Sequence, residues 1–324
     1  MIRFGVLGTA RVVSYGLLTP VREMQGIEVI GIASRTLQKA KEFAEAHGIR
    51  EVFGSYDALL ESADIDAVYV ALPTALHYEW ARRAMEAGKH VLCEKPLAAN
   101  AQLAEELAMC ARQHNRVLVE GLHIRYLGQL RRQRELIASG EFGRLLRIES
   151  CFRATYARMA EGDFRMSFGL GGGATLDLGC YAISCLRYVA GEEPEIVSVR
   201  CKCFSPQVDR WMRAECRFPS GAEGVAECGF RGFYTPRVGV VVTCEGGSIK
   251  WGGPGLVINK NGKSIQEPIA ATPTFRLQLE SFAKSIRGEE SDALSPEDSV
   301  LTARALDRMY NKAGLALRGT LQEV

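Results

Sequence analysis

A lysine follows an apolar, strand-like segment and precedes a proline in VLCEKPL, residues 91–97. Glu94 and Lys95 place two charges at the exit of this strand, and Pro96 cannot continue a β-ladder because it has no backbone N–H. Ligands of open α/β sheets bind outside the carboxyl ends of the strands. The pattern therefore predicts that Lys95 points into a ligand crevice, with Pro96 fixing the corner through a cis Lys95–Pro96 bond. A surface lysine in a strand–helix turn is the alternative.

A glycine turn follows the first apolar strand in FGVLGTARVVS, residues 4–14. The candidate cofactor-binding residues of this turn are Gly8, Thr9, Ala10 and Arg11. Gly8 would let the backbone approach a pyrophosphate, Ala10 would lie where the helix packs close to the sheet, and the first N–H groups of the helix would bind the phosphates. The later glycines of the G-x-G-x-x-G pattern are replaced, so a purely structural turn is the alternative.

The end of the second strand favours NADP over NAD as the cofactor. An NAD site normally has an acidic residue there, which binds the ribose hydroxyls. This chain instead has Ser34 and Arg35 in GIASRT. A guanidinium can pair with a 2′-phosphate and stack on adenine, and Arg11 would assist. An ordinary exposed arginine is the alternative for Arg35.

Short apolar segments alternate with helical patterns up to residue 122. The expected strands are residues 2–8, 27–34, 52–55, 65–73, 90–96 and 116–122. This alternation predicts a parallel sheet covered on both faces. We expect one helix over 126–143, and then strand-like alternation to about residue 270 that predicts a second, largely antiparallel sheet. A helix near 173–190 interrupts it, and the stretch 275–317 is helical again. The expected domains are therefore residues 1–122 and 123–324.

Composition excludes several classes of protein. The chain has 324 residues, 47% hydrophobic and 24% charged, with a formal net charge of +2, as expected for a two-domain globular protein. Charges of both signs are mixed, so neither nucleic acid nor a membrane surface is expected as a partner. No segment reaches the length of a membrane span, and the first residues do not resemble a signal peptide, so we expect a cytoplasmic protein.

The cysteines and histidines predict no metal site. The ten cysteines form no paired C-x-x-C motifs, and the five histidines are scattered without an H-E-x-x-H pattern. We expect the cysteines to be reduced and structural, as in a reducing compartment.

Four segments together resemble the Gfo/Idh/MocA oxidoreductase family, the relatives of glucose–fructose oxidoreductase, inositol dehydrogenase and dimeric dihydrodiol dehydrogenase. They are GVLGTAR at 5–11, the block from ALPTALH to CEKPLA at 71–98, GGGATLDLGCYAI at 171–183 and FRLQLESFAKSIRG at 275–288. The resemblance spans nearly the whole length. It implies an α/β Rossmann domain, then an α+β domain with an open, predominantly antiparallel sheet, and an active site between them. It also implies a homodimer or homotetramer formed through the outer face of that sheet.

The resemblance implies roles for residues of the first domain. Lys95 would lie by the nicotinamide ribose and the reacting oxygen of the substrate, with Glu94 supporting the cofactor. The loop alongside the nicotinamide would contain Leu72, Pro73 and His77. His77 could instead cap the helix that begins near residue 75.

In the second domain, Asp177 and Tyr181 lie four residues apart, so a helix would present them on one face. Many family members have histidine at the position of Tyr181, and a subset that includes NADP-dependent xylose dehydrogenase has tyrosine. A phenol has an ordinary pKa of about 10, which a nearby ammonium lowers. We expect Tyr181 to transfer the substrate's proton with Lys95 supplying that charge, while Asp177 orients other hydroxyls or balances Lys95. A core tyrosine is the alternative.

Two arginines are candidate substrate ligands. Arg165 precedes the glycine run and resembles an arginine of many relatives, although a surface salt bridge is an alternative. Arg125 matches a family arginine, but Leu127 and Gly128 replace the His-Pro that usually follows it.

The expected function is hydride transfer between NADP and a CH–OH or C=O carbon of a sugar, cyclic polyol or dihydrodiol. A reductase of a modified or nucleotide-linked ketosugar and a non-catalytic NADP-binding sensor are the alternatives.

Overall fold

The structure is a computed structural model that describes residues 1–154, 162–230, 237–251 and 253–319. It divides into two compact units, one of Met1–His123 with Pro273–Val300 and one of Ile124–Thr272 with Leu301–Val324. The first unit therefore contains a segment from late in the chain, which the expected two-part division at residue 122 did not include. Among the helices of the described residues, none has the length and apolar composition needed to span a bilayer.

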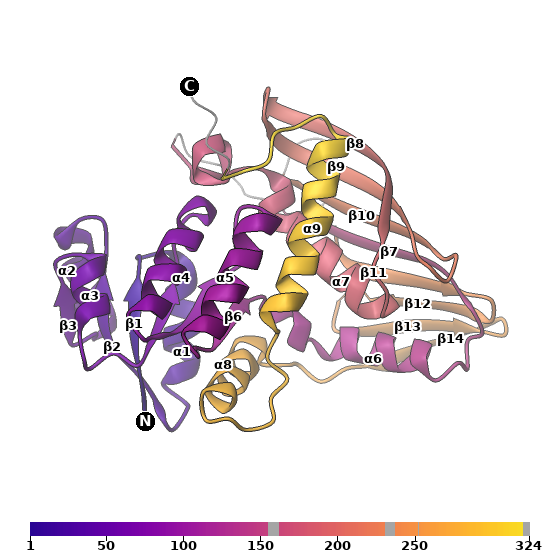
Figure 1. Cartoon of the computed structure of the whole chain (residues 1–324). Helices are drawn as coiled ribbons and strands as arrows, with labels where there is room; N and C mark the ends of the chain where they lie inside the picture. Colours follow the sequence, from indigo (N-terminus) through magenta and orange to yellow (C-terminus); the bar gives the residue numbers. More distant parts are fainter. Residues whose placement is uncertain (155–161, 231–236, 252, 320–324) are drawn as a thin grey trace. The chain divides into compact units, whose positions relative to one another are not determined.

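The first unit contains a six-stranded parallel sheet in the order β3-β2-β1-β4-β5-β6 (Figure 1). Its strands are β1 (Ile2–Leu7), β2 (Ile27–Ala33), β3 (Glu51–Phe53), β4 (Ala67–Val70), β5 (His90–Glu94) and β6 (Leu118–Gly121). The order is that of a Rossmann fold. Strands β1 to β3 are added toward one edge of the sheet and β4 to β6 toward the other, so the strand order changes direction between β1 and β4. All six expected strands are present, so the predicted α/β class is confirmed.

Helices connect these strands, and polar side chains mark where several of them begin. They are η1 (Val13–Leu18), α1 (Thr19–Val21), α2 (Leu37–His47), α3 (Tyr56–Glu61), η2 (Thr74–Leu76), α4 (His77–Glu86) and α5 (Ala101–Gln113). Thr36, Ser55 and Asn100 each accept a backbone N–H at the start of α2, α3 and α5. The helices α4 and α5 pack side by side (Figure 1).

The helix α8 (Thr274–Ile286) completes the first unit. Phe282 is fully buried and its ring lies 5.6 Å from the ring of Phe4 in β1. The expected continuous helical stretch 275–317 is wrong in two respects, because it is interrupted and because it ends at Lys312. Residues 287–295 interrupt it, Gly288 has a positive φ of 72°, and a second helix, α9 (Pro296–Lys312), follows.

The second unit contains an eight-stranded sheet in the order β14-β13-β12-β11-β7-β10-β9-β8. Its strands are β7 (Leu145–Ala154), β8 (Glu195–Ser205), β9 (Val208–Arg217), β10 (Glu223–Phe230), β11 (Arg237–Cys244), β12 (Gly247–Trp251), β13 (Gly255–Lys260) and β14 (Lys263–Pro268). Neighbouring strands are antiparallel except β7 and β10, which are parallel. The predicted, predominantly antiparallel sheet is confirmed.

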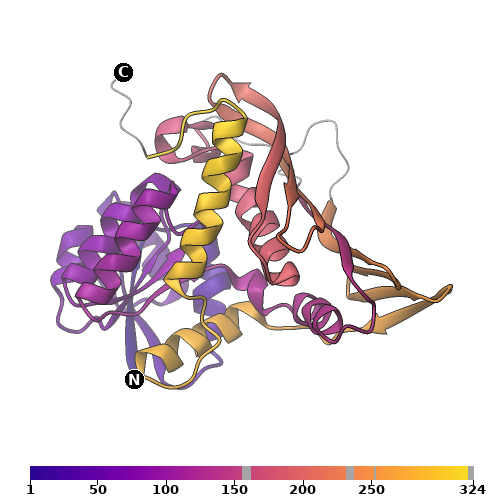
Figure 2. The same cartoon turned by 45° about the vertical axis from the view of Figure 1, so that its right-hand side comes forward.

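The helix α7 (Cys180–Ala190) packs against β7 and β10 on one face of this sheet (Figure 2). A π-helical segment, η6 (Thr175–Gly179), leads into it. The other helical segments are η3 (His123–Tyr126), α6 (Gly128–Ala138), η4 (Phe164–Met166) and η5 (Phe168–Leu170). The expected helix 126–143 is therefore shorter, because α6 ends before Gly140, which has a positive φ of 72°.

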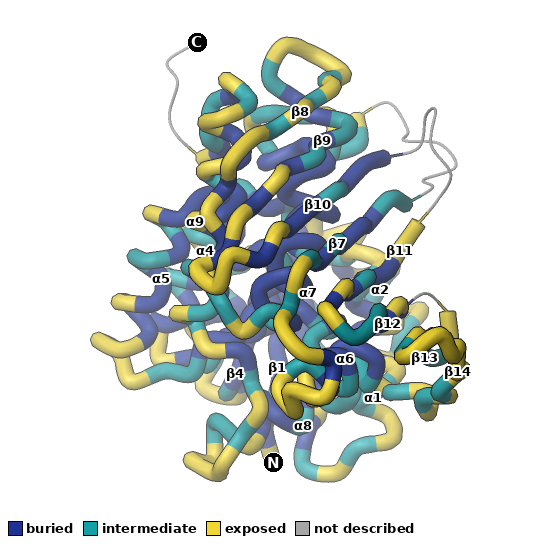
Figure 3. Tube along the Cα trace, turned by 90° about the vertical axis from the view of Figure 1, so that its right-hand side faces the viewer, coloured by how far each residue is buried: buried dark blue, intermediate teal, exposed yellow. Residues whose placement is uncertain are grey.

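Buried and more exposed residues alternate along strands of the second sheet, as the colours of Figure 3 show. In β9, Met212, Ala214 and Cys216 are buried, whereas the residues between them are more exposed. The more exposed side of the sheet carries paired charges, such as Arg213 with Glu227 at 3.2 Å. This alternation is the pattern from which the strands were predicted.

Candidate active site

Lys95 lies at the carboxyl end of β5 on a corner that is otherwise buried. The Lys95–Pro96 peptide bond is cis, as predicted. Every residue from 91 to 101, all within the described chain, is buried apart from Lys95, which is partly exposed. Lys95 is thus the residue that this corner leaves partly exposed.

Two carboxylates hold the backbone around Lys95. Glu94 accepts a hydrogen bond from the hydroxyl of Tyr69 in β4 and one from the backbone N–H of Lys95, at 3.3 Å from Oε2. Glu120 in β6 is buried, and its Oε1 accepts the N–H of Leu97 at 3.0 Å. The sequence patterns indicated Glu94 but not Glu120, which lies near the carboxyl end of the neighbouring strand.

His77 is buried, and its ring joins the loops after β4 and β5. Its Nδ1 lies 2.8 Å from the carbonyl oxygen of Pro96, and its Nε2 lies 2.8 Å from that of Leu72. Burial lowers the pKa of His77, and the nearby charge of Lys95 lowers it further. The ring contacts carbonyl oxygens and not the N–H groups of a helix start, so the helix-capping alternative is wrong. Leu72 and Pro73 are partly exposed in the same loop.

His123 is a site residue that sequence analysis missed. It directly follows the end of β6, stacks on Phe275 with ring centroids 4.0 Å apart, and lies 2.9 Å through Nδ1 from the hydroxyl of Thr274. Burial lowers the pKa of His123 to about 4, and the charge of Lys95 adds to this effect. The rule that selected Lys95, a polar residue just after the carboxyl end of a strand, would also have found it.

The glycine turn is built as a dinucleotide-binding turn requires. Gly8 has a φ of +100°, and an added Cβ would lie 2.5 Å from the carbonyl oxygen of Ala71. The backbone thus passes too close to β4 for any side chain. Thr9 is partly exposed, and Ala10 and Arg11 are exposed where the first helical segment begins, so the N–H groups of a helix start lie next to the turn.

The expectation that Ala10 packs against the sheet is wrong. Ala10 is exposed, and the close packing occurs further along, at the buried Val13 and at Gly16. An added Cβ on Gly16 would lie 3.1 Å from the ring of Phe275 in α8.

Ser34 and Arg35 follow β2 directly. Ser34 is buried and Arg35 is exposed. The N–H of Gly8 donates to the carbonyl of Ala33 at 2.9 Å, so this strand end adjoins the glycine turn. Arg35 therefore lies where the ribose-binding acid of an NAD site would be expected.

In the second unit, a buried ion pair holds the glycine run. Asp209 and Arg318 are both fully buried, with Nη2 of Arg318 3.3 Å from Oδ1 of Asp209. Oδ2 of Asp209 accepts both the N–H and the hydroxyl of Thr175 at 2.7 Å, and Arg318 donates to the carbonyl of Gly172. An added Cβ on Gly173, whose φ is +122°, would lie 2.2 Å from Asp209. Glycine is therefore required at position 173 because the backbone there lies close to the carboxylate of Asp209.

Two predicted site residues of this unit pair with each other. Nε of Arg165 lies 2.8 Å from Oδ2 of Asp177, and both side chains are mostly buried. Arg165 therefore makes a mostly buried salt bridge and not the surface salt bridge of the alternative, and its partner is the predicted Asp177. Tyr181 lies at the start of α7, partly exposed, with its ring stacked on Phe152 at 5.6 Å. The four-residue interval from Asp177 to Tyr181 crosses from the π-helical segment into α7.

Arg125 packs against α7. Its Nη1 donates to the hydroxyl of Ser184 at 3.2 Å, and its guanidinium lies 4.3 Å from the ring centre of Tyr188. Leu127 begins α6 as its N-cap, and the helix continues from Gly128. These contacts give Arg125 a packing role, while its role as a substrate ligand stays a prediction.

Comparisons with known proteins agree with this architecture. The family model for the oxidoreductase family with an NAD-binding Rossmann fold matches residues 2–122, and the Gfo/Idh/MocA C-terminal domain model matches residues 130–250. The chain is 31% identical over 320 residues to a D-xylose 1-dehydrogenase (NADP(+)) from Haloferax volcanii, covering 96% of this chain and 97% of that protein.

A second type of relative reduces nucleotide-linked sugars. The dTDP-3,4-didehydro-2,6-dideoxy-alpha-D-glucose 3-reductase of Actinomadura kijaniata is 39% identical over 196 residues, which cover 60% of this chain and 58% of that protein. The fold is similar to the crystal structure of a 3-ketoreductase from the same organism in complex with NADP and TDP-benzene. The TM-score is 0.88 at 29% identity, covering 96% of this chain and 97% of that one.

Proposed function

Because this chain belongs to the Gfo/Idh/MocA oxidoreductase family, we propose that it transfers a hydride between NADP and a CH–OH or C=O carbon of a sugar, cyclic polyol or dihydrodiol. The observation that carries the proposal is the buried corner around Lys95. Two buried carboxylates and the buried ring of His77 hold this backbone, and the lysine is the group left accessible. Such an arrangement orients one ammonium toward a ligand.

The glycine turn supports a dinucleotide as the cofactor, and the end of β2 supports NADP. Gly8 brings the backbone close to β4 with no side chain in the way, and the exposed helix start provides N–H groups for phosphate. The exposed guanidinium of Arg35 suits a 2′-phosphate. Positions 34 and 35 are serine and arginine, so neither has the acidic residue that binds the ribose hydroxyls in an NAD site. The nicotinamide, when bound, supplies the hydride chemistry.

The side chains divide the remaining tasks. Tyr181 exchanges the proton of the substrate oxygen, because a phenol can act as a general acid and, as phenolate, as a general base. Lys95 binds the same oxygen and favours the phenolate by its charge. Asp177 and Arg165, as an ion pair, offer both acceptors and donors to the other hydroxyls of a polyol. The proposal requires Lys95 and Tyr181 to act on one oxygen.

Turnover on a substrate panel tests the function. The purified chain should bind NADPH more tightly than NADH in a fluorescence titration and should turn over at least one aldose, inositol or dihydrodiol. Tyr181→Phe and Lys95→Met, with their double variant, should show non-additive losses of kcat if the two groups act on one oxygen. NADPH binding without turnover across the panel would favour the non-catalytic sensor.

A second candidate, a reductase of a nucleotide-linked ketosugar, is supported by the 39% identity to the dTDP-sugar 3-reductase. The two candidates share the same chemistry and differ in whether the sugar substrate carries a nucleotide. The ratio of kcat/KM for a dTDP-linked ketosugar to that for a free aldose decides between them. A ratio well above 1 supports the second candidate.

We also propose a cytoplasmic homodimer or homotetramer. None of the ten cysteines, each within the described residues, forms a disulfide, which suits a reducing compartment. The more exposed face of the eight-stranded sheet, with its paired charges, is a suitable surface for a second copy. Light scattering after size-exclusion chromatography measures the mass, and Arg213→Glu should shift it toward the monomer.

A further inference from the structure

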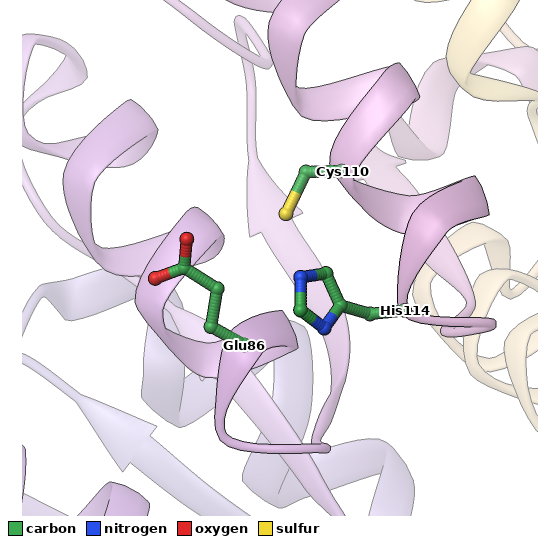
Figure 4. A group of neighbouring side chains, drawn as sticks. All are labelled: Glu86, Cys110 and His114. Carbon is green, nitrogen blue, oxygen red and sulfur yellow. The ribbon is translucent and has the colours of Figure 1, made fainter.

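Three side chains with metal-ligand chemistry lie together where α4 and α5 end. Glu86 is the last residue of α4, Cys110 lies in the last turn of α5, and His114 directly follows that helix. Their ligand atoms all lie within 4.8 Å of one another. Figure 4 shows the thiol and one imidazole nitrogen facing each other, with the carboxylate beside them.

The local backbone explains this grouping. Cys110 and His114 are four residues apart, and the N–H of His114 still donates to the carbonyl of Cys110 at 3.0 Å. The helical geometry therefore continues through this pair and puts both side chains on one face. Asn115, with a φ of +51°, then ends the turn. Because α4 packs beside α5, Glu86 at the end of α4 lies next to these two side chains.

Among the described residues, the thiol and the imidazole have no hydrogen-bond partner that would compete with a metal ion. Within the described part of the chain, neither Sγ of Cys110 nor the ring of His114 makes one, although Cys110 is only 8% exposed. Oε1 of Glu86 accepts from Arg82 at 2.5 Å. A carboxylate has two oxygens, so it can keep this partner and bind a cation through the other.

The donor set selects the kind of metal. A thiolate, an imidazole and a carboxylate are the ligands of Zn²⁺, whereas Mg²⁺ and Ca²⁺ prefer oxygen alone. Ligand atoms around a tetrahedral Zn²⁺ lie about 3.5 Å apart, so the group must contract slightly. Glu86 and His114 are exposed and can rotate to do so. The thiolate and the carboxylate together balance the charge of the ion.

We propose that Glu86, Cys110 and His114 bind one Zn²⁺, with water as the fourth ligand. The ion would cross-link the ends of α4 and α5. These ends lie toward the amino end of the parallel sheet, because α4 runs from the loop after β4 to the start of β5 at His90. Lys95 and the glycine turn lie at the carboxyl ends of the strands. The zinc is therefore a structural or regulatory ligand, and its binding is independent of the proposed hydride transfer.

Metal titration of the full chain tests this proposal. The chain is kept reduced, freed of metal with a chelator, and titrated with ZnCl₂ against a competing dye. We expect one zinc per chain and a loss of affinity of at least about 100-fold in Cys110→Ala and in His114→Ala, since each removes a ligand. Equal affinity in these variants, or no zinc bound by the unaltered chain, would overturn the proposal.

Cobalt and matched variants separate ligation from folding. With Co²⁺ the chain should show a thiolate-to-cobalt charge-transfer band that is absent in Cys110→Ala and present in Met109→Ala, an exposed neighbour on α5. Glu86→Gln changes an exposed side chain with little risk to folding and should weaken zinc binding, whereas Glu79→Gln, the same change at the start of α4, should not. A cobalt spectrum without the charge-transfer band, or equal zinc binding in Glu86→Gln and Glu79→Gln, contradicts the assignment.

Discussion

The backbone of the corner around Lys95 and that of the glycine run before Asp177 are stabilised in different ways. Each must hold an irregular backbone next to candidate site residues. The first uses hydrogen bonds of buried side chains to the backbone, with the ring of His77 between two carbonyl oxygens and Glu120 accepting the N–H of Leu97. The second uses a fully buried ion pair, Asp209 with Arg318, fixed to the glycine run.

This difference determines which charges are accessible. At the first corner, burial and the charge of Lys95 both lower the pKa of His77 and His123. His123 is therefore neutral near pH 7, and Lys95 provides a positive charge at this corner. In the second loop, Arg165 already balances Asp177 and Arg318 balances Asp209. The first region thus presents a charge, whereas the charges of the second region are paired with each other.

Lys95→Met should have the largest effect, because it removes the one charge that the first corner presents. We expect kcat to fall by about 10³-fold, with little change in the unfolding midpoint. The measurement is steady-state turnover with the best substrate of the panel. Lys41→Met, an exposed lysine on α2, is the control and should keep full turnover. Equal rates in the two variants would mean that Lys95 has no part in the chemistry.

Asp209→Ala should destabilise the second unit strongly, because it leaves the guanidinium of Arg318 buried without its carboxylate. Breaking a buried ion pair in this way costs about 3–5 kcal/mol in the free energy of unfolding. Urea denaturation followed by circular dichroism measures it. Glu245→Ala, which breaks the exposed pair with Arg144, should leave stability nearly unchanged. If both variants unfold alike, Asp209 does not anchor the loop.

Gly8→Ala tests the first region through its backbone. The new Cβ would lie 2.5 Å from a backbone oxygen at a φ of +100°, so the turn must shift, at a cost of about 1–3 kcal/mol. We expect NADPH to bind about 10-fold more weakly. Converted to free energy, this loss lies in the lower part of the range given for the shifted turn. Gly54→Ala is the matched control, because nothing lies within 4 Å of its added Cβ. Unchanged NADPH affinity in Gly8→Ala would argue against a cofactor at this turn.

A further effect concerns pH. The pKa of His123 is about 4 in the folded chain and about 6.5 when unfolded. Between these values the unfolded chain binds more protons, so stability rises with pH and falls on acidification. Denaturation at pH 7 and pH 5 should show this loss, and His123→Asn should reduce it. His77 contributes in the same direction, so part of the loss should persist. If the stability of His123→Asn depended on pH in the same way as that of the unaltered chain, the pKa of His123 would not be lowered by folding.

Patterns along the chain predicted most of the fold. The six parallel strands follow from apolar segments separated by helices, and the second sheet follows from alternation such as that in β9. The break between α8 and α9 was missed, although Gly288 marks it. Helical periodicity continues on both sides of a short break, so the pattern alone did not separate the two helices.

The candidate site was predicted less completely. Lys95, Gly8 and Arg35 were found because strand ends and glycine turns have local signatures. Glu120 and His123 were missed, although each lies near the end of β6. Asp209 and Arg318 have no local signature, because the two residues lie more than a hundred positions apart and their role depends on their mutual burial.

The order of short apolar and helical segments by itself determined the α/β class, the glycine turn and the lysine at a strand end, since each depends on neighbours within a few residues. Only the tertiary structure decided which charges are neutralised and which side chains meet. The pairing of Arg165 with Asp177, the burial of Asp209 and the meeting of Glu86 with Cys110 and His114 depend on how distant segments pack. Burial and charge pairing arise from that packing, and no short stretch of sequence contains them.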